Sequence, residues 1–255
     1  MQELSPVTFL ICCPLVFLAG LIDAIGGGGG LISLPAYVLA GLPMHTAIGT
    51  NKVSSACGTA LATSRFAKNK LINYKLALPS IVCAFVGSFI GSNLSLRIDE
   101  HVLQIALIAV LPVVAFIVLN KKIFHDNPGA ELKLDRKTYS VVCIAAFMIG
   151  IYDGLYGPGT GTFLIIAFTV FAGMSIEKAN GQCKAINLTT NLTSAIIFFR
   201  NGTVILPLAL TCAACNMLGG YIGSGLVMKN GAKIVKPVII IVLALLAIKI
   251  VSEFI

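Results

Sequence analysis

Asp23-Ala-Ile-Gly26-Gly27-Gly28-Gly29-Gly30 decides the fold, because an acid and five consecutive glycines interrupt an otherwise apolar sequence. Glycine costs about 1 kcal/mol per residue in a helix relative to alanine, so this run should end a helix. The backbone N–H and C=O groups freed there are tolerated at membrane depth only where they are buried in protein or line a wet cavity. The stretch therefore predicts a helix break that forms a binding site.

The composition indicates an all-α integral membrane protein. Apolar residues make up 57% of the 255 positions and charged residues only 11%, unlike an ordinary soluble domain. Most of the apolar segments approach the ~20 residues that a helix needs to span a bilayer. The segments are 7–25, 31–42, 46–64, 76–96, 102–119, 139–156, 161–174, 179–199, 204–228 and 235–252. We therefore expect a multi-pass protein of the cell (inner) membrane, embedded in the lipid bilayer.

Charge and cysteine content exclude several other classes. The net charge of +8 comes mainly from loop residues, which set membrane topology, so we do not expect nucleic acid as a partner. The one CxxC pair, Cys212 and Cys215, lies in an apolar run without further ligands at metal spacing. We therefore expect neither a metal site nor a cofactor.

The sequence repeats itself at an offset of 130 residues that becomes 132 after the glycines. The aligned pairs include Asp23 with Asp153, Gly27 with Gly157, Gly29 with Gly159, Gly49 with Gly181 and Lys52 with Lys184. Internal duplication is typical of transporter folds. We predict a first transmembrane repeat over 1–125, a polar cytoplasmic linker over 126–137 and a second repeat over 138–255.

Loop charge predicts the relative orientation of the halves. If each glycine run makes the chain turn back, the loop Lys and Arg residues divide 13 against 3 between the two sides; if residues 10–42 are one broken span, they divide 11 against 5. The positive-inside rule prefers the first arrangement. We therefore expect two inverted-topology repeats of about five helical segments each, with glycine-broken helix hairpins near the midplane and both termini outside. Whether each hairpin spans the bilayer or is re-entrant stays open.

Inverted repeats would place both breaks near the midplane, where such transporters bind substrate. Free N–H donors and the positive end of a helix dipole suit an anion. The predicted substrate-binding residues are Gly27, Gly28, Gly29, Gly30, Asn51, Lys52, Gly157, Gly159, Thr160, Gly161, Gln182 and Lys184. Further polar neighbours are Ser33, Thr46, Thr50, Ser54, Ser55, Asn187, Thr190 and Asn191. These neighbours equally suit hydrogen bonds between membrane helices.

Charged residues inside apolar segments are functional candidates by default. Lys52 and Lys184 follow the two breaks, where they either bind the anion or form structural ion pairs. Asp23 and Asp153 precede the breaks and could cap free N–H groups, pair with the lysines or carry protons. Capping or pairing is favoured, because an unpaired carboxylate would oppose an anionic substrate.

Four other glycines have a different expected role. Gly87 and Gly91 in the first half, and Gly219 and Gly223 in the second, have GxxxG spacing within apolar segments. This spacing is typical of helices that pack closely in membranes. We expect these glycines to lie at helix–helix contacts.

The first motif resembles a known family. The run from Gly20 to Pro35, followed by Gly41-Leu-Pro43 and Ala47-Ile-Gly49-Thr50-Asn51-Lys52, resembles the TauE/SafE family of membrane transporters, often called sulfite exporters. The second half carries a degenerate copy, Gly150-Ile-Tyr-Asp153-Gly-Leu-Tyr-Gly157-Pro158-Gly159-Thr160-Gly161, and departs from Thr-Asn-Lys to Gln-Cys-Lys at Lys184. The resemblance implies export of sulfite, sulfoacetate or a related organosulfur anion.

The leading hypothesis is a secondary transporter that exports a small sulfur-containing anion by alternating access. The alternative is an anion channel with the same broken-helix site. An enzyme is not expected, because no nucleophile and base lie at a recognisable spacing. A homo-oligomer is compatible with the sequence.

Overall fold

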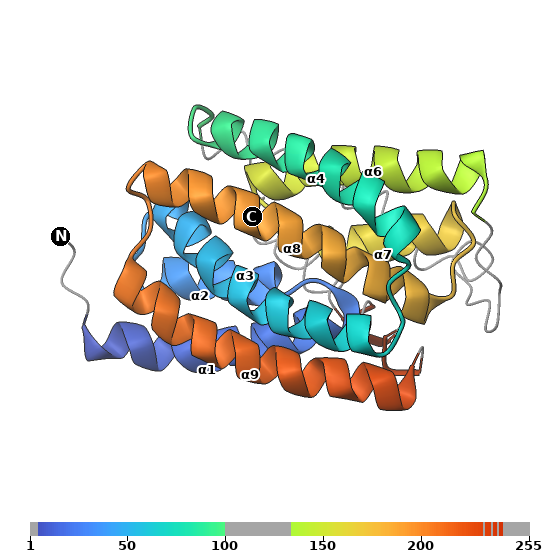
Figure 1. Ribbon diagram of the computed structural model, residues 1–255. Helices are drawn as coiled ribbons and strands as arrows, with labels where there is room; N and C mark the ends of the chain where they lie inside the picture. Colours follow the sequence, from blue (N-terminus) through green and yellow to red (C-terminus); the bar gives the residue numbers. More distant parts are fainter. Residues whose placement is uncertain (1–4, 100–133, 232, 236, 239, 242–255) are drawn as a thin grey trace.

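The computed structural model describes residues 5–99, 134–231, 233–235, 237–238 and 240–241. The first half forms α1 (Pro6–Gly26), α2 (Gly30–Leu39), α3 (Met44–Lys68) and α4 (Tyr74–Ser95). The second half forms α6 (Arg136–Leu155), α7 (Thr160–Val170), α8 (Ile176–Arg200) and α9 (Leu206–Asn230) (Figure 1). The described residues contain no strand, so the predicted all-helical class is confirmed for them.

The observed helices follow the predicted apolar segments within a few residues. The predicted segments 102–119 and 235–252 lie wholly or mostly outside the described residues, as do residues 126–133 of the predicted linker. Helix α6 begins at Arg136, within the range predicted for that linker. The Asp135 side chain accepts a hydrogen bond of 2.8 Å from the backbone N–H of Thr138, which caps the helix there. The same N–H lowers the pKa of the Asp135 carboxyl.

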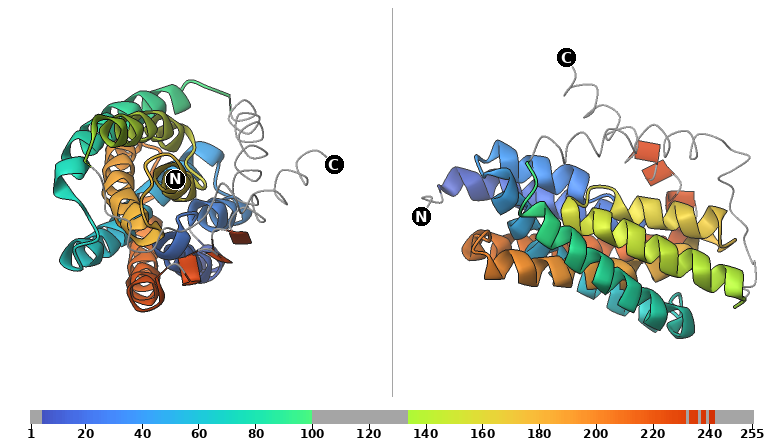
Figure 2. Two further views of the ribbon diagram at one scale, coloured as in Figure 1. Left: turned by 90° about the vertical axis from the view of Figure 1, so that its right-hand side faces the viewer. Right: turned by 90° about the horizontal axis from the view of Figure 1, so that it is seen from above.

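Apolar helices surround a polar central pair. Among the described helices, α1, α4, α6 and α9 are long and apolar enough to cross a membrane. Large apolar side chains on their outer faces are exposed, including Leu10, Leu78, Ile144 and Leu218. The 25-residue helices α3 and α8 contact one another between the α4/α6 pair and the α1/α9 pair (Figures 1 and 2). This arrangement suits a bilayer, because lipid faces the apolar helices and the polar pair is covered.

Close glycine contacts hold α4 against α6 and α1 against α9. A Cβ atom at Gly91 would lie 2.1 Å from the carbonyl oxygen of Ile151, and one at Gly219 would lie 2.0 Å from that of Phe17. Gly87 and Gly223 are equally crowded by the neighbouring helix. The predicted packing role of the four GxxxG glycines is therefore confirmed. Each half contributes its fourth helix to the first helix of the other half.

Contacts along the helices define their directions. Gly87 faces Phe147 and Gly91 faces Ile151, so α4 and α6 run in parallel. The contacts between α1 and α9, and those between α3 and α9, show in the same way that each of these pairs runs in parallel. Helices α3 and α8 are antiparallel, since Thr63 donates to the carbonyl of Lys184 and Asn191 to the hydroxyl of Thr59. Ser88 and Ser92 bond α8 at residues 190 and 194, so α4 runs with α8.

These directions gather most of the basic residues of the described chain at one end of the bundle, the right-hand end in Figure 1. Helices α3 and α9 finish there, whereas α4, α6 and α8 begin there. The basic residues at this end are Arg65, Lys68, Lys70, Lys75, Arg136, Lys137, Lys178, Lys229 and Lys233. The opposite end carries Arg97 and Arg200. We call the first of these the basic end.

Candidate functional site

The first glycine run ends one helix and starts another within four residues. Helix α1 ends at Gly26, and Gly27 has a φ of 68°, a left-handed conformation that favours glycine. The chain then enters α2 at Gly30. The side chain of Asp23 lies at this turn, where its Oδ1 accepts hydrogen bonds of 3.3 and 3.4 Å from the N–H groups of Gly28 and Gly29. These donors precede α2, at the positive end of its dipole.

The second break has the same plan with different donors. Helix α6 ends at Leu155, and α7 begins at Thr160 after two glycines with left-handed φ angles, Gly157 and Gly159. The hydroxyl of Thr160 donates a 2.7 Å hydrogen bond to Oδ1 of Asp153. A side-chain hydroxyl therefore occupies the role that backbone N–H groups have beside Asp23.

The two breaks lie against each other. A Cβ at Gly27 would be 2.3 Å from the carbonyl carbon of Gly161, so only glycine permits this approach. Free carbonyls at the end of α1 receive donors from the second half: Thr162 donates to Gly26 at 2.8 Å, and Asn180 donates to Ile25 at 2.8 Å. The exposed backbone of one break is thus partly satisfied by side chains near the other.

Each buried lysine pairs with the aspartate of the opposite half. Lys52 Nζ lies 2.8 Å from Asp153 Oδ2, and Lys184 Nζ lies 3.0 Å from Asp23 Oδ2. Lys184 also donates to the backbone carbonyl of Asp23. The exposed fractions of the two lysines are only 2% and 0%. The formal charges of the four groups cancel, which reduces the cost of burying them.

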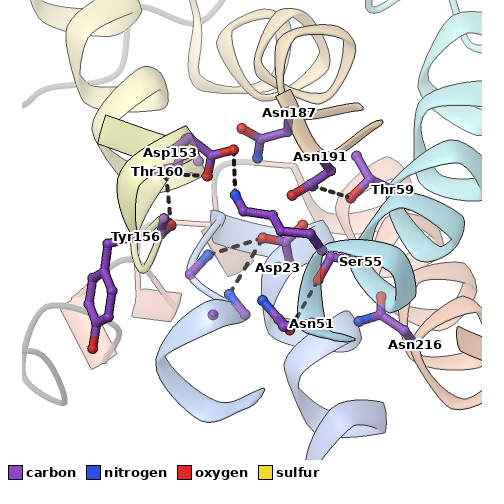
Figure 3. A pocket seen from close by; sticks show the side chains of 17 residues that line it. Asp23, Asn51, Ser55, Thr59, Asp153, Tyr156, Thr160, Asn187, Asn191 and Asn216 are labelled. Atoms are coloured by element: carbon purple, nitrogen blue, oxygen red, sulfur yellow. Dashed lines mark hydrogen bonds and ion pairs between the residues drawn. The ribbon is translucent and has the colours of Figure 1, made fainter. Parts of the chain in front are cut away.

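A polar cavity of about 30 Å³ lies where the breaks, α3 and α8 meet (Figure 3). Its lining from the two breaks is Asp23, Gly28, Gly29, Gly30, Asp153, Tyr156, Gly157, Gly159, Thr160 and Gly161. Helices α3, α8 and α9 add Asn51, Lys52, Ser55, Thr59, Asn187, Asn191 and Asn216. We call this space the central cavity. Its hydrogen-bond donors include ammonium, amide and hydroxyl groups, a set that suits an oxyanion.

The two carboxylates differ in their access to this cavity. The side chain of Asp23 is 26% exposed, whereas that of Asp153 is 6% exposed. Asp153 is held by a lysine and a short hydroxyl bond, while the N–H contacts of Asp23 are long. Asp23 is therefore the more exposed carboxylate and the one with the longer hydrogen bonds, so a ligand can displace it more easily.

Three predicted substrate-binding residues do not line the central cavity. Gly27 packs against Gly161, and Lys184 is bonded to Asp23. Gln182 lines a different cavity. The structure brings the other predicted residues of the two breaks and of α3 together around one space.

Two residues that line the central cavity were not predicted from the sequence. Thr59 lies two turns beyond Lys52 on α3, and Asn216 lies on α9, far along the chain from both breaks. Gly20 and Gly58 both pack against Asn216, a contact that forms only in the folded chain. Among the described residues, no three His, Cys, Asp or Glu side chains are placed to hold a metal ion.

Comparison with known proteins assigns the chain to a family. The family described as sulfite exporter TauE/SafE matches residues 12–250. The probable membrane transporter protein ORF9 of Sinorhizobium sp is 33% identical over 254 residues, covering 99% of this chain and 96% of the relative. The probable membrane transporter protein YfcA of Escherichia coli K12 is 32% identical, with 98% and 91% covered. No solved structure matches the chain. The chain therefore belongs to the sulfite exporter TauE/SafE family of membrane transporters.

Proposed function

We propose that this protein is a secondary transporter that exports a small sulfur-containing anion, such as sulfite, sulfoacetate or a related sulfonate, across the cell membrane by alternating access. The observation that carries the proposal is the central cavity, in which glycine backbone, a buried lysine and amide side chains from both halves face one space. The geometry favours small oxyanions in general. The restriction to sulfur rests on the description of the family.

The halves act as inverted repeats in this proposal. Support comes from the helix directions: α3 opposes α8, and α4, which runs with α8, opposes α9. Helices α1 and α3 run in the same direction, so α2 must return the chain between them. A returning α2 favours a glycine-broken hairpin over a single broken span. Many secondary transporters have this construction, with the substrate at the interface between the repeats.

The membrane orientation follows from charge. Cytoplasmic loops carry an excess of Lys and Arg, and the basic end of the bundle has that excess. We therefore assign the basic end to the cytoplasm. An anion to be exported would approach the protein from this side, where the positive charge also attracts it.

Anion binding must change the existing charge balance, because Lys52, Lys184, Asp23 and Asp153 already neutralise one another. In this mechanism the Asp23 carboxylate acts as a tethered anion on the Gly28 and Gly29 N–H groups. An incoming oxyanion replaces it there when the Asp23 side chain turns away. The vacated donors and the Lys184 ammonium then hold the substrate.

The crossed ion pairs link substrate binding to movement between the halves. Lys52 belongs to the first half and Asp153 to the second, and the other pair is crossed in the opposite sense. A rocking motion of one half against the other must therefore lengthen or rearrange these contacts. An anion that takes the place of a carboxylate changes the energy of that rearrangement, which is the differential interaction that a conformational change requires.

Reconstitution in lipid vesicles tests this function. We expect saturable uptake of radiolabelled sulfite, accelerated by unlabelled sulfite inside the vesicles, because a carrier exchanges ligand across the membrane. The variant Thr59→Val removes one hydroxyl from the central cavity and should weaken sulfite binding five- to tenfold, about 1 kcal/mol. The control Thr211→Val removes an exposed hydroxyl on α9 and should leave binding unchanged.

Two outcomes would contradict the carrier mechanism. Sulfite conductance at channel rates without counterflow would establish the anion channel with the same broken-helix site. Conversion of a sulfonate to a new product by the purified protein would establish an enzyme. Calorimetric titration with sulfite, sulfoacetate and chloride identifies the preferred anion, and preference for chloride would contradict the sulfur-containing substrate.

A further inference from the structure

A second polar cavity lies at the basic end of the bundle and shares no lining residue with the central cavity. Its volume is about 150 Å³. Lys70 and Asn73 line it from the turn between α3 and α4, and Lys178 and Gln182 line it from the start of α8. The cavity therefore lies between the two halves of the chain, outside the ion-pair cluster.

The described lining carries positive charge and no carboxylate. Lys70 and Lys178 approach the cavity from different halves, and Lys178 belongs to the first turn of α8, where the helix dipole also favours an anion. Glu177, its neighbour on that turn, is directed toward Gly231: a Cβ there would lie 2.0 Å from Glu177 Oε1. The positive charge that surrounds the cavity therefore favours an anion.

Gln182 supplies a separate indication of a missing ligand. Its side chain is 2% exposed, and its Nε2 has no hydrogen-bond partner among the described residues. A buried donor without an acceptor lowers stability, so such groups usually have a partner in the functional state. The side-chain amide of Gln182 borders the same cavity as the two lysines.

The equivalent place at the other end of the bundle lacks these features. At the offset of 132 residues, Gly202 replaces Lys70, Thr46 replaces Lys178 and Thr50 replaces Gln182. The hydroxyl of Thr50 is satisfied, because it accepts a hydrogen bond from the N–H of Ile205. Lys70 adopts a φ of 57°, and Gly202 adopts 73°. The first half thus keeps a lysine in a left-handed conformation that glycine adopts at lower cost.

We propose that this second cavity is an oxyanion-binding site at the basic end of the bundle, which holds its ligand through the ammonium groups of Lys70 and Lys178 and the side-chain amide of Gln182. The ligand is a free inorganic oxyanion or the phosphate of a lipid headgroup, since both present the same charged oxygen atoms. The binding site does not depend on the transport activity proposed above, because it uses none of the residues of the central cavity.

The test uses the purified full-length chain and inorganic phosphate as the probe for a free anion. Calorimetric titration should detect phosphate binding that Lys70→Gly weakens at least fivefold. This variant copies the residue and conformation of position 202 and so preserves the turn. Lys178→Thr and Gln182→Thr copy the other end in the same way. The control Lys68→Ala removes an equal charge from the adjacent end of α3, outside the cavity, and should leave phosphate binding unchanged.

A second arm examines lipid as the source. Protein extracted from vesicles of phosphatidylethanolamine and phosphatidylglycerol is analysed by native mass spectrometry, where Lys70→Gly should retain less phosphatidylglycerol than Lys68→Ala. Loss in either arm supports the site and identifies its ligand. The proposal is wrong if Lys70→Gly and Lys178→Thr match Lys68→Ala in both arms, or if Thr59→Val, which alters only the central cavity, abolishes the phosphate binding.

Discussion

In each crossed ion pair, one lysine and one aspartate neutralise each other's charge. Lys52 is 2% exposed and the Asp153 side chain 6%, so neither charge is solvated if its partner is lost. We expect Lys52→Met to lower the free energy of unfolding by about 3–5 kcal/mol, because it leaves the Asp153 carboxylate buried and uncompensated. Equilibrium unfolding in detergent micelles measures this change.

The double variant Lys52→Met with Asp153→Leu is the control for this prediction. It removes both charges and should recover most of the lost stability, because well-packed apolar residues often replace a buried ion pair at little cost. A single variant as stable as the unaltered protein would contradict a buried, unsolvated pair.

Asp23 carries a second prediction at the level of one side chain. Asp23→Asn leaves the Lys184 ammonium without its carboxylate and removes the negative charge beside Gly28 and Gly29. We expect tighter sulfite binding in this variant.

Calorimetric titration of both proteins with sulfite measures the change in affinity. The charged groups that face Asp23 are Lys184 from α8 and, across the central cavity, Lys52 and Asp153. Asp135→Asn is the matched control, since it makes the same chemical change at an exposed helix cap where asparagine also caps well. Weaker sulfite binding in Asp23→Asn would contradict the tethered-anion mechanism.

At the level of helices, the contact between α4 and α6 depends on glycine. A methyl group at Gly91 would lie 2.1 Å from the Ile151 carbonyl oxygen, which belongs to helix backbone and cannot move alone. We expect Gly91→Ala to destabilise the protein by about 1–3 kcal/mol through overpacking. Gly225→Ala on α9 is the control: its nearest neighbour is the end of the flexible Arg65 side chain, at 3.2 Å. Thermal unfolding of both variants in one detergent checks the difference.

The control should be neutral or slightly stabilising, because alanine favours a helix over glycine by about 1 kcal/mol. Equal melting temperatures for Gly91→Ala and Gly225→Ala would mean that α4 and α6 are not held this closely.

Much of the element structure was predictable from sequence, for local reasons. Glycines fix the end of α1 at Gly26 and the start of α2 at Gly30, and hydropathy locates the long apolar helices. The exact start of α6 was not predictable from hydropathy, because a polar cap at Asp135 sets it within the predicted linker.

The site was predictable only in part, because its contacts join residues far apart in the chain. The repeat identified Asp23, Lys52, Asp153 and Lys184, but a local pattern cannot specify that each lysine reaches the other half. Asn216 enters the central cavity through packing of α9 on α1 and α3, which no local signal encodes.

At the level of the whole molecule, the relative orientation of the two halves determines which side of the membrane each loop occupies. The α3–α4 turn and the start of α8 share one cavity at the basic end, whereas α8 finishes at the opposite end. Asn69 and Asn201 are equivalent positions at the offset of 132, each directly after its helix and each exposed. Inverted repeats require them to lie on opposite sides of the membrane, and parallel repeats require the same side.

Cysteine labelling distinguishes these arrangements. After the eight native cysteines are replaced, Asn69→Cys and Asn201→Cys are introduced separately and treated with a membrane-impermeant maleimide. In intact cells we expect Asn201→Cys to react and Asn69→Cys to react only after lysis, because the positive-inside rule assigns the basic end to the cytoplasm. The two sites are matched in sequence position and exposure, so differential access explains a difference between them. Reaction of both cysteines from the same side would contradict the inverted arrangement. Reaction of Asn69→Cys alone in intact cells would support inverted repeats but reverse the assigned membrane orientation.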